Sequence, residues 1–119
     1  MGLRIGSIVM VVDDFPRALA FWSAALDATP RHEPGEDWVI LDHAGSTVAL
    51  ALDSAGRAPA YVPPRIHLDL YADDQAAEVE RLKGLGATEV HWDKRPVDAD
   101  YVIMQDPDGN RFCVVDVSR

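Results

Sequence analysis

The segment RIGSIVMVVDD, residues 4–14, recurs as RIHLDLYADD at residues 65–74, about 60 residues further along the chain. Both copies have the pattern of a strand that ends in an Asp-Asp pair, and the second copy is one residue shorter. Internal similarity at a fixed offset is the signature of a repeated structural unit. The sequence therefore indicates two copies of one supersecondary unit.

The similarity continues beyond the Asp-Asp pairs. Apolar residues at helical spacing follow each pair: Leu19, Trp22 and Leu26 in the first copy, Val79, Leu82 and Leu85 in the second. The phrase LDAT at 26–29 then corresponds to LGAT at 85–88, where Gly86 is suited to end a helix. Further on, DWVIL at 37–41 matches DYVIM at 100–104. Each copy is predicted to contain a strand, a helix and three more strands.

The predicted strands cover residues 4–12, 28–32, 37–42, 47–52, 65–72, 87–93, 101–105 and 111–117. The segment DPDGN at 106–110 has the turn chemistry that joins antiparallel strands, so a hairpin is expected there. We predict one α+β domain over residues 1–119, made of two βαβββ half-modules at about 3–53 and 64–119. A linker rich in Pro, Ala and Gly joins them at about 54–63.

Length and composition agree with this organisation. The chain has 119 residues and 13.1 kDa, with 48% hydrophobic and 26% charged residues, as in an ordinary soluble domain. Its longest apolar runs are five residues, against the roughly 20 that a membrane-spanning helix needs. With no signal-peptide pattern and a single cysteine, Cys113, we expect a cytoplasmic protein without a membrane partner.

The charge balance bears on the partner. A net charge of -9 and a pI near 4.6 give a field that repels phosphate backbones. We therefore expect no nucleic-acid partner and a small molecule instead. Gly84-Leu85-Gly86 is not a dinucleotide fingerprint, because it ends a predicted helix and lacks the third glycine.

Three stretches carry a resemblance to a known family: VVDDFPRALAFW at 11–22, RIHLDL at 65–70 and DPDGNRF at 106–112. With the duplication, they make the chain resemble the vicinal oxygen chelate superfamily, which includes glyoxalases, bleomycin-resistance proteins and extradiol dioxygenases. The resemblance covers essentially the whole chain. It implies two βαβββ modules whose mixed sheet curls around a half-open cleft, usually completed in a homodimer. It also implies one divalent ion, held by residues of the first and last strands of the modules.

The ligand positions of the family fall on unpromising residues here. The first-strand positions are Ser7 and His67, and the last-strand positions are Cys113 and, by the repeat, Ala49, or Ala51 if the register differs by two. A hard octahedral cation needs several oxygen ligands, which this set does not supply. We therefore expect no cofactor and disfavour a divalent metal; if one binds, its ligands are His67 and Cys113.

Period-two alternation predicts which side chains accompany His67. On the strand at 65–72, Ile66, Leu68, Leu70 and Ala72 should pack on the helix, which leaves His67, Asp69 and Tyr71 on the cleft face. Trp38 and Tyr101 occupy repeat-related strand positions, and Trp92 precedes a charged loop. The predicted ligand-binding residues are Ser7, Trp38, Ala49, His67, Asp69, Tyr71, Trp92, Tyr101 and Cys113.

Two functions are compatible with this set. The first is metal-free binding of a small, partly aromatic molecule, as in glyoxalase and bleomycin-resistance-like proteins. The second is a lyase, isomerase or dioxygenase-type enzyme, with His67 as a metal ligand or as a base oriented by Asp69. The missing metal ligands favour the first. A homodimer is expected in either case, because a half-open cleft leaves sheet edges and apolar surface to be covered.

Overall fold

The computed structural model describes residues 2–54 and 65–118. Its elements are β1 (Leu3–Val11), α1 (Phe15–Leu26), β2 (Thr29–Pro30), β3 (Trp38–Asp42), β4 (Ala49–Asp53), β5 (Ile66–Ala72), α2 (Gln75–Gly84), β6 (Thr88–Glu89), β7 (Tyr101–Gln105) and β8 (Arg111–Asp116). They divide into two compact units. The first unit runs from Gly6 to His67, and the second combines the residues before Gly6 with those from Leu68 onward.

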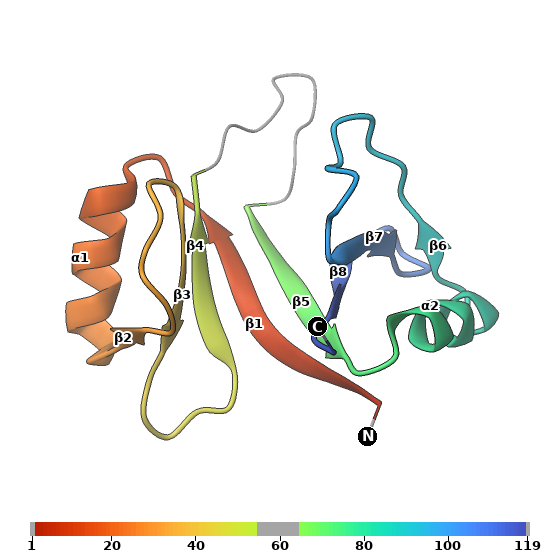
Figure 1. Cartoon of the computed structure of the whole chain (residues 1–119), viewed down its shortest axis with the longest axis horizontal. Coiled ribbons are helices and arrows are strands. Elements are labelled where there is room, and N and C mark those ends of the chain that lie inside the picture. Colours follow the sequence, from red (N-terminus) through yellow and green to blue (C-terminus); the bar gives the residue numbers. More distant parts are fainter. Residues whose placement is uncertain (1, 55–64, 119) are drawn as a thin grey trace. The chain divides into compact units, whose positions relative to one another are not determined.

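In the first unit, α1 packs on one face of the strands in the order β2-β3-β4-β1 (Figure 1). The β2–β3 and β3–β4 pairs are antiparallel, and β4 runs parallel to β1. Asp14 caps the helix by accepting a hydrogen bond from the backbone N–H of Arg17 at 3.1 Å. The core consists of Phe15, Ala28, Val39, Leu41, Leu50 and Leu52, with α1 side chains packed against it.

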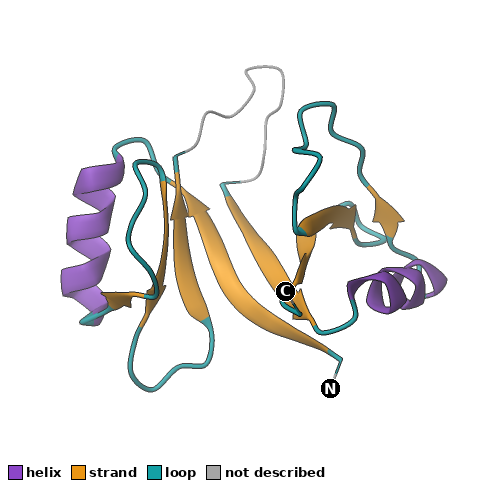
Figure 2. Cartoon of the chain, in the orientation of Figure 1, coloured by secondary structure: helices purple, strands orange, loops and turns teal. Residues whose placement is uncertain are grey.

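The second unit repeats this arrangement, with α2 packed on strands in the order β5-β8-β7-β6 (Figure 2). Here β5 runs parallel to β8, and the other two pairs are antiparallel. Asp74 caps α2 through the N–H of Ala77 at 3.1 Å, as Asp14 caps α1. The core consists of Ala72, Val79, Met104 and Val114. The duplicated βαβββ order and the α+β class predicted from the sequence are confirmed.

The hairpin between β7 and β8 is also confirmed. One carboxylate, that of Asp106, accepts hydrogen bonds from the N–H of Asp108 at 2.9 Å and from the N–H of Asn110 at 2.8 Å. The side-chain amide of Asn110 donates to the second oxygen of Asp106 at 2.9 Å. Gly109 has φ +89°, a conformation that glycine adopts without strain. The turn thereby sets the register that places Cys113 opposite Ile103.

Three sequence predictions need correction. The second and sixth strands are two residues each, Thr29–Pro30 and Thr88–Glu89, where 28–32 and 87–93 were expected. On β5, Ile66 is 54% exposed and Leu68 36% exposed, although both were expected to pack on the helix. The reason is that the 10-residue α2 is only about 15 Å long and cannot cover the whole of β5. The β5 residue in the core beneath α2 is Ala72, at the C-terminal end of the strand.

The repeat also needs a two-residue change of register. Val9 pairs with Ala51 on β4, as Asp69 pairs with Cys113 on β8. The first-unit counterpart of Cys113 is therefore Ala51, the position expected if the register differs by two, and not Ala49, which pairs with Ser7. Neither alanine has a metal-binding side chain, so the shortage of ligands in this half is unchanged.

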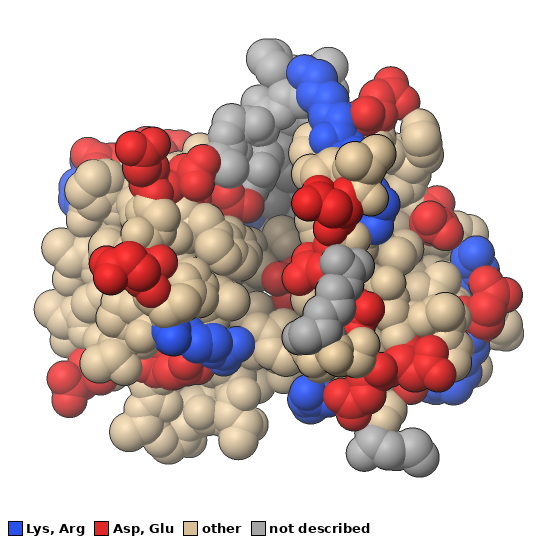
Figure 3. Space-filling model, in the orientation of Figure 1, with Lys and Arg blue, Asp and Glu red and all other residues tan. Residues whose placement is uncertain are grey.

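Acidic side chains are distributed over the visible face, with Lys and Arg among them (Figure 3). Within the described part of the chain, no helix combines the length and the apolar character needed to cross a membrane. The predicted linker at 54–63 lies outside the described residues except for Ser54, so the single-domain organisation stays a prediction.

Candidate functional site

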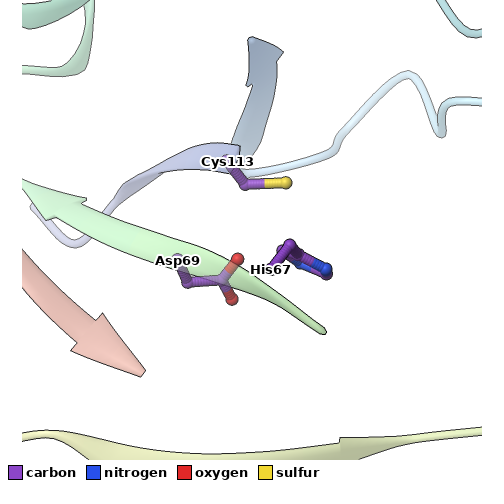
Figure 4. Close-up of side chains that lie close together, drawn as sticks. All are labelled: His67, Asp69 and Cys113. Atoms are coloured by element: carbon purple, nitrogen blue, oxygen red, sulfur yellow. The ribbon is translucent and has the colours of Figure 1, made fainter. Parts of the chain in front are cut away.

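Three side chains with metal-binding or proton-transfer chemistry converge on neighbouring strands. His67 and Asp69 lie two residues apart on β5, and Asp69 is the direct partner of Cys113 on β8. One donor atom from each side chain lies within 4.8 Å of the other two, and all three residues are half-buried. The side chains extend in a common direction from the two strands (Figure 4). We call this group the His-Asp-Cys cluster.

The local sequence explains the convergence. Alternate residues of a strand point to opposite faces, so His67 and Asp69 share the face that α2 does not cover. On the opposite face, Ala72 and Val114 are fully buried beneath α2 and anchor β5 and β8. The cluster therefore stands on two packed strands, which hold side chains in more reproducible positions than loops do.

Two predicted aromatic residues lie on the same strand face. Tyr71 of β5 and Tyr101 of β7 are both cross-strand partners of Val115 on β8, one on each side. Each ring is covered by a guanidinium group, with Arg4 at 5.9 Å from the centroid of Tyr71 and Arg95 at 5.5 Å from that of Tyr101. The strand register places both rings beside the apolar Val115, and each ring makes a cation–π contact.

The position of Arg95 is fixed by further contacts. Its Nε donates to the backbone carbonyl of Tyr101 at 2.9 Å, and its Nη2 donates to the same carbonyl. The Nη2 atom also donates to the carbonyl of Ala99 at 3.5 Å. The loop before β7 is thus tied to the edge of the candidate site.

Sequence reasoning missed two residues of this face. Arg111 lies two residues before Cys113 on β8, and Ile103 is the cross-strand partner of Cys113 on β7. The same alternation that selected Asp69 and Tyr71 from His67 would have selected Arg111 from Cys113. The cluster therefore has a cationic neighbour on its own strand face.

The other predicted site residues lie elsewhere. Ser7, Ala49 and Trp38 lie on β1, β4 and β3, where Ser7 pairs with Ala49 and Trp38 pairs with Asp53. Ser7 is completely buried, and its Oγ has no hydrogen-bond partner among the described residues. Trp92 lies in the loop between β6 and β7 and not on a strand. The structure thus brings together five of the nine predicted residues on one strand face: His67, Asp69, Tyr71, Tyr101 and Cys113.

An open pocket occurs in the first unit, on the α1 side of the strands. It is lined by Ile8, Trp22, Leu26, His43, Ser46, Val48, Ala49 and Leu50. Only Ala49 belongs to the predicted set. The pocket has only two polar side chains in its lining, His43 and Ser46. The side chains with metal-binding or proton-transfer chemistry converge on β5 and β8 instead. The His-Asp-Cys cluster is therefore the stronger candidate site.

Comparison with solved structures identifies the fold. Methylmalonyl-CoA epimerase from Mycobacterium tuberculosis aligns with a TM-score of 0.64 and 21% identity, over 97% of this chain and 87% of that one. A Streptomyces coelicolor methylmalonyl-CoA epimerase in complex with 2-nitronate-propionyl-CoA aligns over 100% of both chains, with a TM-score of 0.69 and 18% identity.

A glyoxalase/bleomycin resistance protein/dioxygenase superfamily member from Vibrio splendidus 12B01 aligns with a TM-score of 0.58 and 18% identity, over 94% of this chain and 98% of that one. At these identities the likeness establishes the fold alone. No curated protein sequence matches the chain. The family model described as a glyoxalase-like domain matches residues 7–115. This chain therefore belongs to the glyoxalase-like domain family.

Proposed function

We propose that this protein binds a small, partly aromatic molecule on the strand face that carries the His-Asp-Cys cluster. The observation that supports this most is the convergence of His67, Asp69 and Cys113 within 4.8 Å, half-buried on two packed strands. Small-molecule sites combine an apolar lining with a few polar groups that fix orientation. Here Tyr71, Val115 and Tyr101 would supply the lining, and the cluster would supply the polar groups.

The metal centre of the superfamily does not fit the residues present. That centre takes ligands from both half-modules, and in the first unit the corresponding side chains are a serine hydroxyl and alanines. A hard divalent ion with octahedral coordination needs more oxygen ligands than Ser7 and Asp69 provide. The proposed binding function therefore does not depend on that centre.

The sole cysteine of the chain provides a direct test, because Cys113 lies inside the proposed site. Alkylation of Cys113 by iodoacetamide, followed by mass spectrometry, measures whether a compound covers the thiol. The probes would be phenol, benzamidine and benzoate, followed by a library of aromatic fragments in the presence of a chelator. A compound at 100 times its Kd leaves about 1% of the protein unliganded and should slow alkylation by up to about 100-fold.

The chain offers a matched control for this test. His91 and Asp93 form a second His-x-Asp pair, with 2.9 Å between Nε2 and Oδ1, but their side chains are 87% and 91% exposed. Protection should be lost in His67→Ala and retained in His91→Ala. If no fragment protects the thiol, or if His67→Ala is protected as well as the wild type, the proposal is wrong.

A second candidate function is proton transfer without a metal. It is favoured by one feature, a carboxylate oxygen of Asp69 within 4.8 Å of a ring nitrogen of His67, since a carboxylate can orient an imidazole that acts as a base. Two of the structures with this fold are methylmalonyl-CoA epimerases by name. The net charge of -9 opposes a coenzyme A ester, whose phosphates are anionic, so binding remains the favoured function.

Incubation with methylmalonyl-CoA in D2O tests the enzymatic candidate. If His67 exchanges a proton with the carbon next to the thioester, deuterium enters the substrate, and His67→Gln should abolish this exchange. Absence of exchange above the rate without protein would reject this reaction for the chain.

A homodimer and a cytoplasmic location belong to the same proposal. The homodimer is supported by large apolar side chains left at the surface, such as Phe21 at 60% and Leu85 at 67% exposure. Light scattering at micromolar concentration tests it, and a monomer would contradict it.

A further inference from the structure

We infer that Arg95 selects an aromatic carboxylate as the ligand of the proposed site. Arg95 lies in the loop between β6 and β7, and its guanidinium covers the ring of Tyr101, which shares the strand face of the His-Asp-Cys cluster. This inference rests on the proposed function and deepens it. It gives the small aromatic molecule a negative charge and names the residue that binds this charge.

Arg95 differs from the other cations of the chain in its partners. Most Lys and Arg side chains in the described residues form an ion pair with a carboxylate: Arg4, Arg17, Arg31, Arg65, Arg81 and Lys83. The half-buried Arg95 contacts two backbone carbonyls and an aromatic ring instead. Within the part of the chain that the structure describes, no carboxylate neutralises its charge.

The guanidinium of Arg95 also keeps a hydrogen-bond donor in reserve. An arginine has five N–H groups, of which Nε carries one and each Nη carries two. Nε and Nη2 donate to the carbonyls of Tyr101 and Ala99, whereas Nη1 has no acceptor among the described residues. Hydrogen bonds from a guanidinium to an oxygen anion are about twice as strong as those between neutral groups. An anionic oxygen of the ligand is therefore the acceptor that suits Nη1 best.

The loop holds this guanidinium in place before any ligand binds. The backbone N–H of Arg95 donates to the carbonyl of Trp92 at 3.1 Å, and that of Ala99 donates to the carbonyl of Pro96 at 3.2 Å. The side chain is fastened in turn to Tyr101, the first residue of β7. A side chain that is already ordered loses little further entropy on binding, so its charge contributes more fully to affinity.

The spacing along β8 fits an aromatic acid. Tyr101 is the cross-strand partner of Val115, which lies two residues beyond Cys113 on the same strand face. Two residues of a strand span about 7 Å, which is comparable to the length of a benzoate ion. A benzoate whose carboxylate accepts from Arg95 would lay its ring over Val115 and direct the far edge of the ring toward Cys113.

The acidic groups of the chain do not prevent this binding. Asp69 of the cluster and Tyr101 are separated by two strand spacings and two residues, roughly 12 Å between their Cα atoms. That exceeds the screening length of about 8 Å at physiological ionic strength. The acidic residues of the loop are all exposed, so solvent screens them as well: Asp93, Asp98 and Asp100. The close guanidinium therefore outweighs the net charge of -9 for a ligand with one carboxylate.

Benzoate and benzamide provide the test, because they have nearly the same shape and differ in charge. The full-length chain would be titrated with each compound in the presence of a chelator, and the Kd would be taken from protection of Cys113 against iodoacetamide. We expect benzoate to bind about ten- to a hundredfold more tightly than benzamide, the range for a hydrogen bond between charged groups. Arg95→Gln should raise the Kd of benzoate to that of benzamide.

Two variants serve as matched controls. Lys94→Gln removes the neighbouring exposed charge, and Arg4→Gln removes the guanidinium that covers Tyr71 but is paired with Asp73. Both should keep the preference for benzoate. Circular dichroism shows whether each variant is folded. If Arg95→Gln loosens the loop and weakens both probes, Arg95→Lys, which retains the charge, should still prefer benzoate.

The inference is overturned if the wild type binds benzamide or benzamidine as tightly as benzoate, or if Arg95→Gln keeps the preference. It is also overturned if none of these three compounds protects Cys113. The proposed function has a separate outcome, because it holds if any fragment of the aromatic library protects the thiol. Equal protection by charged and neutral fragments would thus reject the role of Arg95 and leave the binding site in place.

Discussion

Replacing Ser7 by alanine should stabilise the protein. Ser7 is completely buried on β1, between Gly6 and Ile8 and opposite Ala49, and its hydroxyl has no hydrogen-bond partner among the described residues. A buried polar group without a partner costs about 1–3 kcal/mol of desolvation. Alanine removes that hydroxyl and leaves the backbone pairing of β1 with β4 unchanged.

The expected gain is about 1 kcal/mol, the lower end of that range, since losing the oxygen also removes some packing contacts. With an unfolding entropy of about 2.1 cal/mol/K per residue, a chain of 119 residues should gain about 4 °C in Tm. Urea denaturation at pH 7 and differential scanning calorimetry measure both quantities.

The matched control is Ser46→Ala. The Oγ of Ser46 donates to the carbonyl of Val48 at 2.8 Å and accepts from its N–H at 3.1 Å, so this substitution should cost about 0.5–1 kcal/mol. The same chemical change is thus expected to have opposite signs at the two positions. A loss of more than 1 kcal/mol in Ser7→Ala would refute the reasoning, because it would mean that the hydroxyl makes a stabilising contact in the folded protein.

Three other changes have expected outcomes. Met104→Ala, at a fully buried position under α2, should lower the free energy of unfolding by about 2–5 kcal/mol in urea denaturation. Asp74→Ala removes the cap of α2 and should cost about 1 kcal/mol, measured in the same way. Hydrogen bonds from the Asn110 side chain and backbone hold the pKa of Asp106 below its ordinary value of 3.8. The unfolded state therefore protonates Asp106 at a higher pH than the folded state does. The stability contributed by the ionised carboxylate is present above pH 3.8 and is lost as the pH falls below that value. Asp106→Asn should reduce this loss of stability at acid pH, measured by denaturation at a series of pH values.

Much of the fold followed from the duplicated segment. The Asp-Asp pairs placed both helix starts, because a capping aspartate before an apolar periodic run is a strong local signal. Alternation placed His67, Asp69 and Tyr71 on one face of β5, since side-chain direction within a strand depends on sequence spacing alone.

The site itself depended on contacts that the sequence does not encode locally. Asp69 opposes Cys113 because β5 and β8 pair in parallel, across a connection that includes α2 and two other strands. Such a register is set by packing and not by a turn, so the sequence does not predict that Asp69 lies opposite Cys113. From the sequence, His67 and Cys113 are paired only as possible metal ligands, and Asp69 only as the group that orients His67. The exposure of Ile66 and Leu68 was also beyond what the local sequence of β5 encodes, because the length of α2 decides how much of β5 the helix covers.

The central claim is that the strand face of His67, Asp69 and Cys113 is the binding site. It is tested most directly by two-dimensional ¹H–¹⁵N NMR of the labelled protein, titrated with a fragment that protects Cys113 from alkylation. The account predicts that the largest shift changes fall on the amides of β5, β8 and β7 around these residues. Changes concentrated instead on α1, β3 and β4, around the open pocket of the first unit, would contradict it.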